Sequence, residues 1–158
     1  MPTTAAQQQV TTGTAIKTML QISTPATRQL QIISWGFTLD DPPGADGVIE
    51  LLQTDVAATV TAHVAAGVQP LDPNAPASLM TLGVANTGYT ASAEGTTAAA
   101  RVFDVVSLSS VSGESPLVYK YQFMPDERPI VAISKFLRVR ATTPTTAVDL
   151  RCYVTWDE

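Results

Sequence analysis

The sequence has few charged and few aromatic residues, and these two shortages exclude several classes of protein. Charged residues make up 15% of the 158 residues, whereas roughly 25% is usual for a soluble domain. Nine Lys and Arg oppose fourteen Asp and Glu, for a net charge of −5. The basic residues form no patch interleaved with aromatics, so we expect no nucleic-acid partner. Aromatic residues are only 6%, too few to line the cleft that glycoside hydrolysis needs.

The chain also has a single histidine, which limits the chemistry available to it. A Ser–His–Asp set would have to use His63, and this residue lies in an Ala-, Thr- and Val-rich stretch without a nucleophile elbow. A cupin-type metal site needs several histidines. Asp40, Asp41 and Asp46 could suggest calcium, but they occupy a Pro- and Gly-rich turn, where Asp is common for its own backbone bonding. We therefore expect no enzyme, no catalytic residues, no metal and no cofactor.

The single cysteine, Cys152, excludes an internal disulfide. Its place on the apolar side of the last predicted strand favours a buried core residue over a reactive thiol or an intermolecular bridge. No apolar run approaches the ~20 residues of a membrane helix, so no membrane contact is expected. The first fifteen residues lack the basic and apolar regions of a signal peptide. We expect a chain that is made in a host cytoplasm and stays there or leaves by lysis.

What the sequence does contain is alternation of apolar and polar residues, which predicts strands. The predicted strands cover residues 14–22, 30–39, 48–55, 101–110, 117–123, 130–133, 135–142 and 148–156, with a short strand at 78–84. Turns rich in Pro, Gly and Asp separate them, and no long helix or fixed-period repeat is visible. The pattern predicts one all-β domain over residues 14–158, an antiparallel β-sandwich or jelly roll.

Three segments lack this alternation. Residues 1–13 are polar and predict an extended N-terminal arm, which is either a floppy terminus or a segment that lies on a neighbouring subunit. Residues 55–68 are rich in Ala, but their β-branched residues favour extended structure with at most one helical turn. Residues 69–100 read as loop-dominated, and a connection this long is either functional or ordered against a partner.

The last strand is expected to pair with residues 135–142 through a hairpin loop at 143–146. Leu137 and Val139 would then meet Leu150 and Cys152 on the core side. On the outer side, Arg138, Arg140 and Arg151 would gather beside Asp149 as a mildly basic stripe. The stripe is either an ordinary solvated sheet face or a contact surface for an acidic partner.

Four stretches resemble small β-rich virion proteins of tailed bacteriophages, of the kind found in phages of actinobacterial hosts. They are residues 12–40, 48–59, 93–104 and 135–158, the last closing in a strand–TxP–strand pattern with WDE. The resemblance covers nearly the whole chain and is one of fold and spacing. It implies a structural or decoration protein on the phage particle, leaves head or tail open, and brings no functional residues with it.

On this basis we expect a capsid decoration protein in the virion that binds the major capsid protein on the outer surface of the head and stabilises it. We expect a homo-oligomer, a trimer in particular, because three-fold sites are abundant on icosahedral shells. The arm and the loops of residues 63–100 would carry the contacts. The expected interface residues are Gln7, Gln8, Gln9, Val10, Arg138, Arg140 and Arg151.

The alternative is a tail-associated module that binds a carbohydrate or a receptor. Such a module would expose Tyr89, Tyr119, Tyr121 or Trp35 in a shallow groove. The low aromatic content makes this the second hypothesis.

Overall fold

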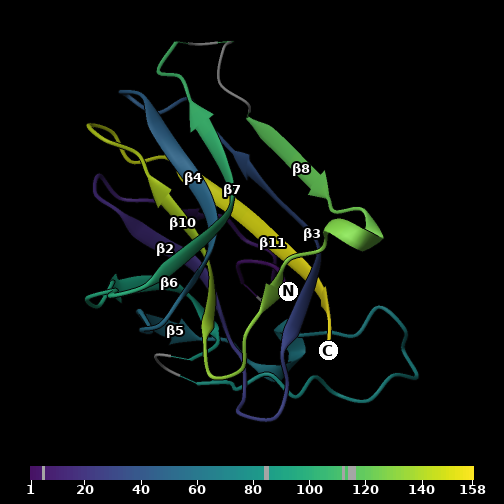
Figure 1. Ribbon diagram of the computed structural model, residues 1–158. Helices are drawn as coiled ribbons and strands as arrows, with labels where there is room; N and C mark the ends of the chain where they lie inside the picture. The colour runs from purple at the N-terminus through teal and green to yellow at the C-terminus, as the bar shows by residue number, and fades with distance from the viewer. Residues whose placement is uncertain (5, 84–85, 112, 114–116) are drawn as a thin grey trace.

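The computed structural model describes residues 1–4, 6–83, 86–111, 113 and 117–158, and it has two antiparallel sheets arranged as a β-sandwich (Figure 1). The five-stranded sheet has the order β1 (Val10–Thr11), β11 (Asp149–Asp157), β3 (Leu30–Leu39) and β8 (Val118–Gln122), with β9 (Ile130–Val131) paired to the beginning of β3. The six-stranded sheet has the order β5 (Thr59–Ala62), β6 (Gly88–Ala93), β2 (Lys17–Ser23), β10 (Phe136–Thr142), β4 (Gly47–Thr54) and β7 (Ala100–Leu108). Two short 3-10 helices, η1 (Ala65–Gly67) and η2 (Pro125–Glu127), lie in connections. The predicted all-β sandwich is confirmed, while the jelly-roll assignment stays a prediction.

Alternate residues of the central strands fill the space between the sheets. On β3 and β11 the buried side chains include Trp35, Phe37, Leu150, Cys152 and Val154. The opposite sheet contributes Leu20, Ile22, Leu51, Leu137 and Val139 to the same core. Burying one such large apolar side chain is worth about 1.5–3 kcal/mol. For β10 and β11 the core contains the side chains that the alternation predicted there, Leu137, Val139, Leu150 and Cys152.

The predicted pairing of the last strand is wrong. β11 lies between β1 and β3, whereas β10 lies between β2 and β4 in the other sheet. The connection at residues 143–146 therefore crosses from one sheet to the other and is not a hairpin. Alternation indicates which face of a strand is buried. It does not indicate whether two strands that face one core lie in the same sheet or in opposite sheets. The sequence pattern could not distinguish these two arrangements.

The middle of the chain departs from the prediction in one place and follows it in another. Residues 55–68 contain the short β5 and the single turn η1, which confirms extended structure with at most one helical turn. Residues 88–93, which we expected to be loop, form β6. The expected strand at 78–84 is reduced to isolated bridges at Thr81 and Leu82, and its last residue lies outside the described residues. The strand β6 was missed because its residues GYTASA are mostly small and show little alternation.

No helix among the described residues is long and apolar enough to cross a membrane.

The N-terminal segment lies against the last strand of its own chain. β1 pairs with β11, Pro2 forms a bridge with Tyr153, and the Val154 amide donates to the Met1 carbonyl at 3.0 Å. Thr12 donates its amide to the Val148 carbonyl at 2.9 Å. The described part of residues 1–13 is thus bound to its own subunit. Neither of the two predicted alternatives, a floppy terminus or an arm on a neighbouring subunit, included this arrangement.

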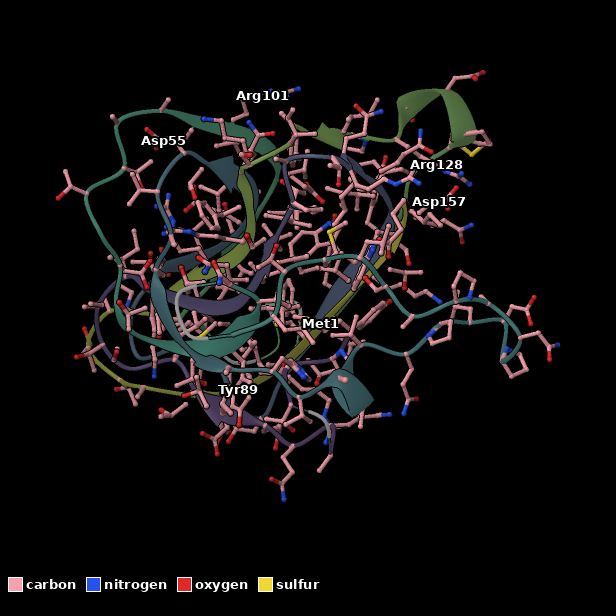
Figure 2. The ribbon with its side chains drawn as sticks, turned by 90° about the horizontal axis from the view of Figure 1, so that it is seen from below. Met1, Asp55, Tyr89, Arg101, Arg128 and Asp157 are labelled. Carbon is pink, nitrogen blue, oxygen red and sulfur yellow. The ribbon has the colours of Figure 1, made fainter. Side chains whose placement is uncertain are left out.

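Residues 63–87 form a long connection that extends away from the two sheets, the teal loop in Figures 1 and 2. Its ends are fixed, because the His63 amide donates to the Thr87 carbonyl at 3.1 Å and the Thr81 amide donates to the Ser23 carbonyl at 3.0 Å. Residues 69–78 have no hydrogen bond to a described residue of either sheet. The middle of this connection therefore projects with little support.

Candidate interaction surfaces

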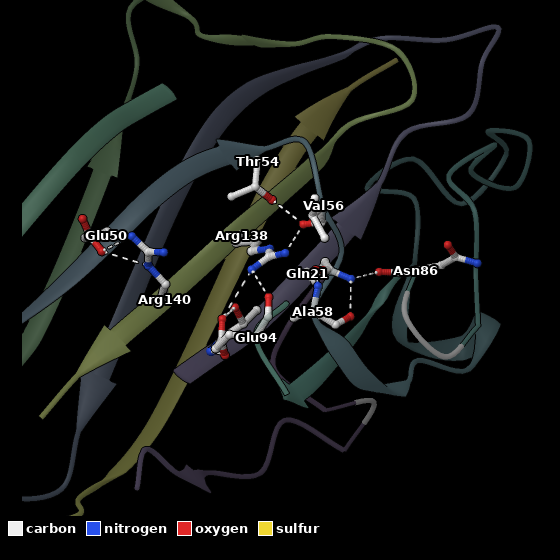
Figure 3. A network of polar contacts seen from close by, with 10 residues as sticks. Gln21, Glu50, Thr54, Val56, Ala58, Asn86, Glu94, Arg138 and Arg140 are labelled. Carbon is white, nitrogen blue, oxygen red and sulfur yellow. Dashed lines mark hydrogen bonds and ion pairs between the residues drawn. The ribbon is translucent and has the colours of Figure 1, made fainter. Parts of the chain in front are cut away.

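The predicted interface residue Arg138 is buried and has a structural role. Its side chain lies on the outer face of the six-stranded sheet, where it contacts Val56 and Glu94 (Figure 3). One terminal nitrogen donates to the Glu94 carbonyl at 3.1 Å and to the Glu94 carboxylate at 3.3 Å, and the other donates to the Val56 carbonyl. Burial lowers the pKa of the guanidinium and the Glu94 carboxylate raises it, yet an arginine keeps its charge in proteins. Arg138 is therefore unavailable to a partner.

Two more polar side chains, Thr18 and Gln21, belong to the hydrogen-bond network around Arg138. Glu94 also accepts from the Thr18 amide and, at 2.7 Å, from the Thr18 hydroxyl. Gln21 donates to the Asn86 carbonyl at 2.7 Å and accepts from the Ala58 amide at 2.8 Å (Figure 3). Buried polar groups are tolerated when they are bonded in this way. The sequence showed none of these partners, because they come from strands far apart along the chain.

The other two arginines do not form a stripe with Arg138. Arg140 is paired with Glu50, with 2.9 and 3.0 Å between their nitrogen and oxygen atoms, and both side chains are mostly buried. Arg151 is exposed on β11, in the opposite sheet. The predicted basic stripe is wrong for the same reason as the predicted hairpin, since β10 and β11 belong to different sheets.

The glutamines of the N-terminal segment are exposed, unlike most of its other described residues. Gln7, Gln8 and Gln9 are exposed, and Val10 is half-buried against the core. Gln7 has a positive φ of 56° and its amide donates to the Thr4 carbonyl at 2.9 Å, so this part of the segment is a turn. These three exposed side chains can contact another molecule, whereas the predicted interface residue Arg138 is buried and cannot.

Below this turn, Thr3 and Cys152 make a buried contact. The Cys152 amide donates to the Thr3 hydroxyl at 2.6 Å, and that hydroxyl donates to the Cys152 carbonyl at 2.9 Å. Burial raises the pKa of the Cys152 thiol to about 12. Because the thiolate is the reactive form, Cys152 is a core residue and not a nucleophile.

His63 also has a structural environment. Its Nε2 atom lies 3.0 Å from the Pro2 carbonyl oxygen, and its ring meets the Tyr89 ring edge-on with 5.6 Å between centroids. The ring occupies the place that a side chain at position 67 would take, so Gly67 is required there. His63 therefore ties the start of the 63–87 connection to the N-terminal segment.

The aromatic residues named for a carbohydrate site do not share one exposed surface. Trp35 is fully buried, and its indole Nε1 donates to the Asp104 carboxylate at 3.0 Å. The Tyr119 hydroxyl donates to the same carboxylate oxygen at 2.7 Å. Burial, followed by the bonded carboxylate, raises the pKa of Tyr119. Tyr89 lies in the other sheet beside His63, and only Tyr121 of the four is substantially exposed.

The surface that the sequence missed is the projecting connection itself. Among the described residues of the 63–87 connection, four large apolar side chains are exposed: Val64, Leu71, Leu79 and Leu82. Leu71 is the most exposed of these, at 86%. Exposed apolar residues gathered on one segment mark contact sites more often than scattered ones do. Leucines placed among Pro70, Pro73 and Pro76 were the feature that could have revealed this surface.

A groove of about 500 Å³ separates this connection from the end of β11. Leu71, Pro76 and Leu79 line one side, and Trp156 lies on the other with Arg28 and Asp157. The groove is closed at one point, where the Leu79 amide donates to the Glu158 carboxylate at 2.8 Å. The exposed connection and the groove together form one apolar surface, which we call the loop surface.

Within the part of the chain that the structure describes, no three His, Cys, Asp or Glu side chains are grouped so that they could hold a metal ion. Asp40 and Asp46, considered for calcium, are bonded to the backbone, since Asp40 accepts from the Asp149 amide at 2.8 Å and Asp46 from the Ser110 amide at 2.9 Å. Comparisons with known protein families, curated proteins and solved structures found no match for this chain. The resemblance to phage virion proteins therefore stays a prediction.

Proposed function

We propose that this chain is a non-enzymatic structural protein of a phage virion, a decoration protein that binds the outer surface of the head as a homo-oligomer. Its partners are the major capsid protein and further copies of itself, and neither nucleic acid nor a membrane is among them. The sequence resemblance and the low charge support this proposal. The observation that carries it is the loop surface, because a rigid sandwich that projects exposed leucines is suited to binding another protein surface.

The loop surface replaces the interface that the sequence predicted. Arg138 is buried and Arg140 is paired within the subunit, so neither contributes to the proposed contact. Gln7, Gln8 and Gln9 are exposed and remain candidates for a second contact. A repeated shell lets several weak contacts of this kind add up, since copies that engage the lattice together gain avidity.

The first experiment locates the protein. Particles of the phage that carries this gene are purified, analysed by mass spectrometry and labelled with antibodies to the chain for electron microscopy. We expect the chain in the particles, with label over the head. Label confined to the tail would overturn the head assignment in favour of the tail-associated module, and absence from the particles would overturn the virion proposal.

A second experiment tests the loop surface. Heads that lack the protein are mixed with the wild-type chain, with L71D/L79D or with V118D, and the pelleted heads are analysed. Leu71 and Leu79 belong to the loop surface, whereas Val118 is exposed on β8 and does not line the groove. We expect L71D/L79D to bind at least tenfold more weakly and V118D to bind as the wild type does. Equal binding by all three chains would contradict the role of the loop surface.

A further inference from the structure

The edges of the two sheets differ in how they are protected against pairing with another chain. Proteins keep edge strands short, charged or covered, because an exposed edge offers unpaired backbone groups to a further strand. Three of the edge strands are short, namely β1 with two residues, β5 with four and β8 with five. β7 has nine residues and pairs only with β4, on one side. β7 is therefore the long edge of the described structure.

The second half of β7 is regular and has a neighbouring strand on one side only. A bulge separates Val102 from Asp104, and from Asp104 to Leu108 the register with β4 is unbroken. The Val105 amide donates to the carboxylate of its neighbour Asp104 at 2.9 Å, so it does not point to β4. In an antiparallel ladder every second residue points its amide and carbonyl away from the partner. Val105 and Ser107 therefore point their backbone groups to the free edge, where the Val105 amide exchanges the Asp104 carboxylate for a carbonyl of the second copy when the two strands pair.

The side chains of this half-strand are compatible with a second copy of itself. Val105 is 51% exposed and Ser107 is exposed, both on the outer face of the sheet, and Val102 adds a further exposed apolar side chain on that face. The only charged residue from 104 to 108 is Asp104, which faces inward to Trp35 and Tyr119. Self-pairing of β7 thus brings no like charges into contact. β8, in contrast, has the exposed Lys120 at its centre, which would oppose its own copy.

We propose that the β7 edge is the site at which two copies of this chain associate, by antiparallel pairing of residues 104–108 about a two-fold axis. In this arrangement Val106 lies opposite its own copy, and the Val105 and Ser107 backbones of the two copies exchange hydrogen bonds. The two six-stranded sheets then continue into one another across the axis. An isologous contact of this kind closes as a dimer, whereas the sequence led us to expect a trimer.

This inference deepens the self-association in the proposed function, but its test uses the isolated chain in solution and no phage particle. The molar mass of the whole chain is measured by light scattering and by sedimentation over a range of concentrations. We expect a mass twice that of the chain, and stronger association at higher salt, because each copy carries a net charge of −5. A monomer at every concentration, or a trimer, would overturn the β7 contact and leave the head-binding experiment unaffected.

Two variants test the position of the contact. V105K places a charge at the free edge, and S107P removes an amide that β4 does not use. Each should weaken dimerisation at least tenfold, while V118K on β8 should leave it unchanged; circular dichroism confirms that each variant is folded. A second measurement does not depend on substitution, since amide exchange at Val105 and Ser107 should slow as the chain is concentrated. Dimers that persist in both variants, or exchange that ignores concentration, would refute the proposal.

Discussion

The N-terminal segment and the 63–87 connection are both irregular by sequence, yet the structure treats them in opposite ways. Residues 1–4 and 10–12 are bonded to β11, and Thr3 and Thr12 are completely buried. Residues 69–78 are nearly all exposed and have no hydrogen bond to a described residue of either sheet. Polar composition therefore did not decide which segment belongs to the fold. The Thr3 and Thr12 hydroxyls accept hydrogen bonds from the backbone amides of Cys152 and Val148, whereas residues 69–78 make no such bond to the described residues of the sheets.

The strongest test of this contrast is to remove each segment in turn. Deleting residues 2–12 should lower the free energy of unfolding by about 3 kcal/mol or more, because several buried groups lose partners at about 1–3 kcal/mol each. Replacing residues 70–78 with a short Gly-Ser linker should change it by less than about 1 kcal/mol, since loop length costs little. Urea denaturation measures both. Equal losses in the two variants would show that the connection supports the fold as much as the N-terminal segment does.

A single hydroxyl should produce a smaller effect of the same kind. Thr3→Val keeps the shape of the side chain but leaves the buried Cys152 amide without an acceptor. We expect a loss of about 1–3 kcal/mol in urea denaturation. Thr59→Val is a control at an exposed strand position and should lie within about 0.5 kcal/mol of the wild type. A Thr3→Val chain as stable as the control would mean that this contact contributes nothing.

The thiol beneath Thr3 gives a prediction on pH. Burial raises the pKa of Cys152 from 9 in the unfolded chain to about 12 in the folded one. The folded state therefore favours the protonated thiol, and this contribution is complete below pH 9 and is lost as the pH rises from 9 to about 12. Relative to Cys152→Ala, the wild type should lose stability over that range in urea denaturation at each pH. A thiol reagent should also label the native wild type slowly and the unfolded chain quickly, and fast native labelling would contradict this burial.

The smallest effect is expected in the projecting connection. Leu71→Ser changes a side chain that is almost fully exposed, so the free energy of unfolding should stay within about 0.5 kcal/mol of the wild type. Thermal unfolding followed by circular dichroism is sufficient to check this. A clear destabilisation would indicate that Leu71 packs within the subunit and would remove it from the loop surface.

The sequence predicted the parts of the fold that depend on one strand at a time. The alternation located β3 over residues 30–39, and Cys152 was correctly expected in the core. What depends on two strands was missed, since no periodicity shows that β10 and β11 lie in opposite sheets. A small-residue strand such as β6 was missed for lack of any pattern.

The candidate site was predicted less well than the fold. The alternation with Leu137 and Val139 placed Arg138 on the outer face of its sheet, as the structure does. Its burial on that face was missed, because the burial depends on Glu94, which is 44 positions away. Leu71 was assigned to a loop and Leu79 to a short strand, and the exposure of both was missed, because a sequence does not show whether an apolar residue finds a place in the core. Both errors concern contacts between distant segments, which the sequence alone does not encode in any local pattern.

The place of β11 has a consequence for how the chain folds during synthesis. β11 lies between β1 and β3, so β3 has no neighbour on one side and the N-terminal segment has no support until residue 157 is made. Domains dominated by such distant pairings fold on the order of milliseconds to seconds. The nascent chain therefore carries an incomplete sheet until β11 has been made. A ribosome-bound chain that stops before residue 149 should be sensitive to protease where the finished protein is resistant.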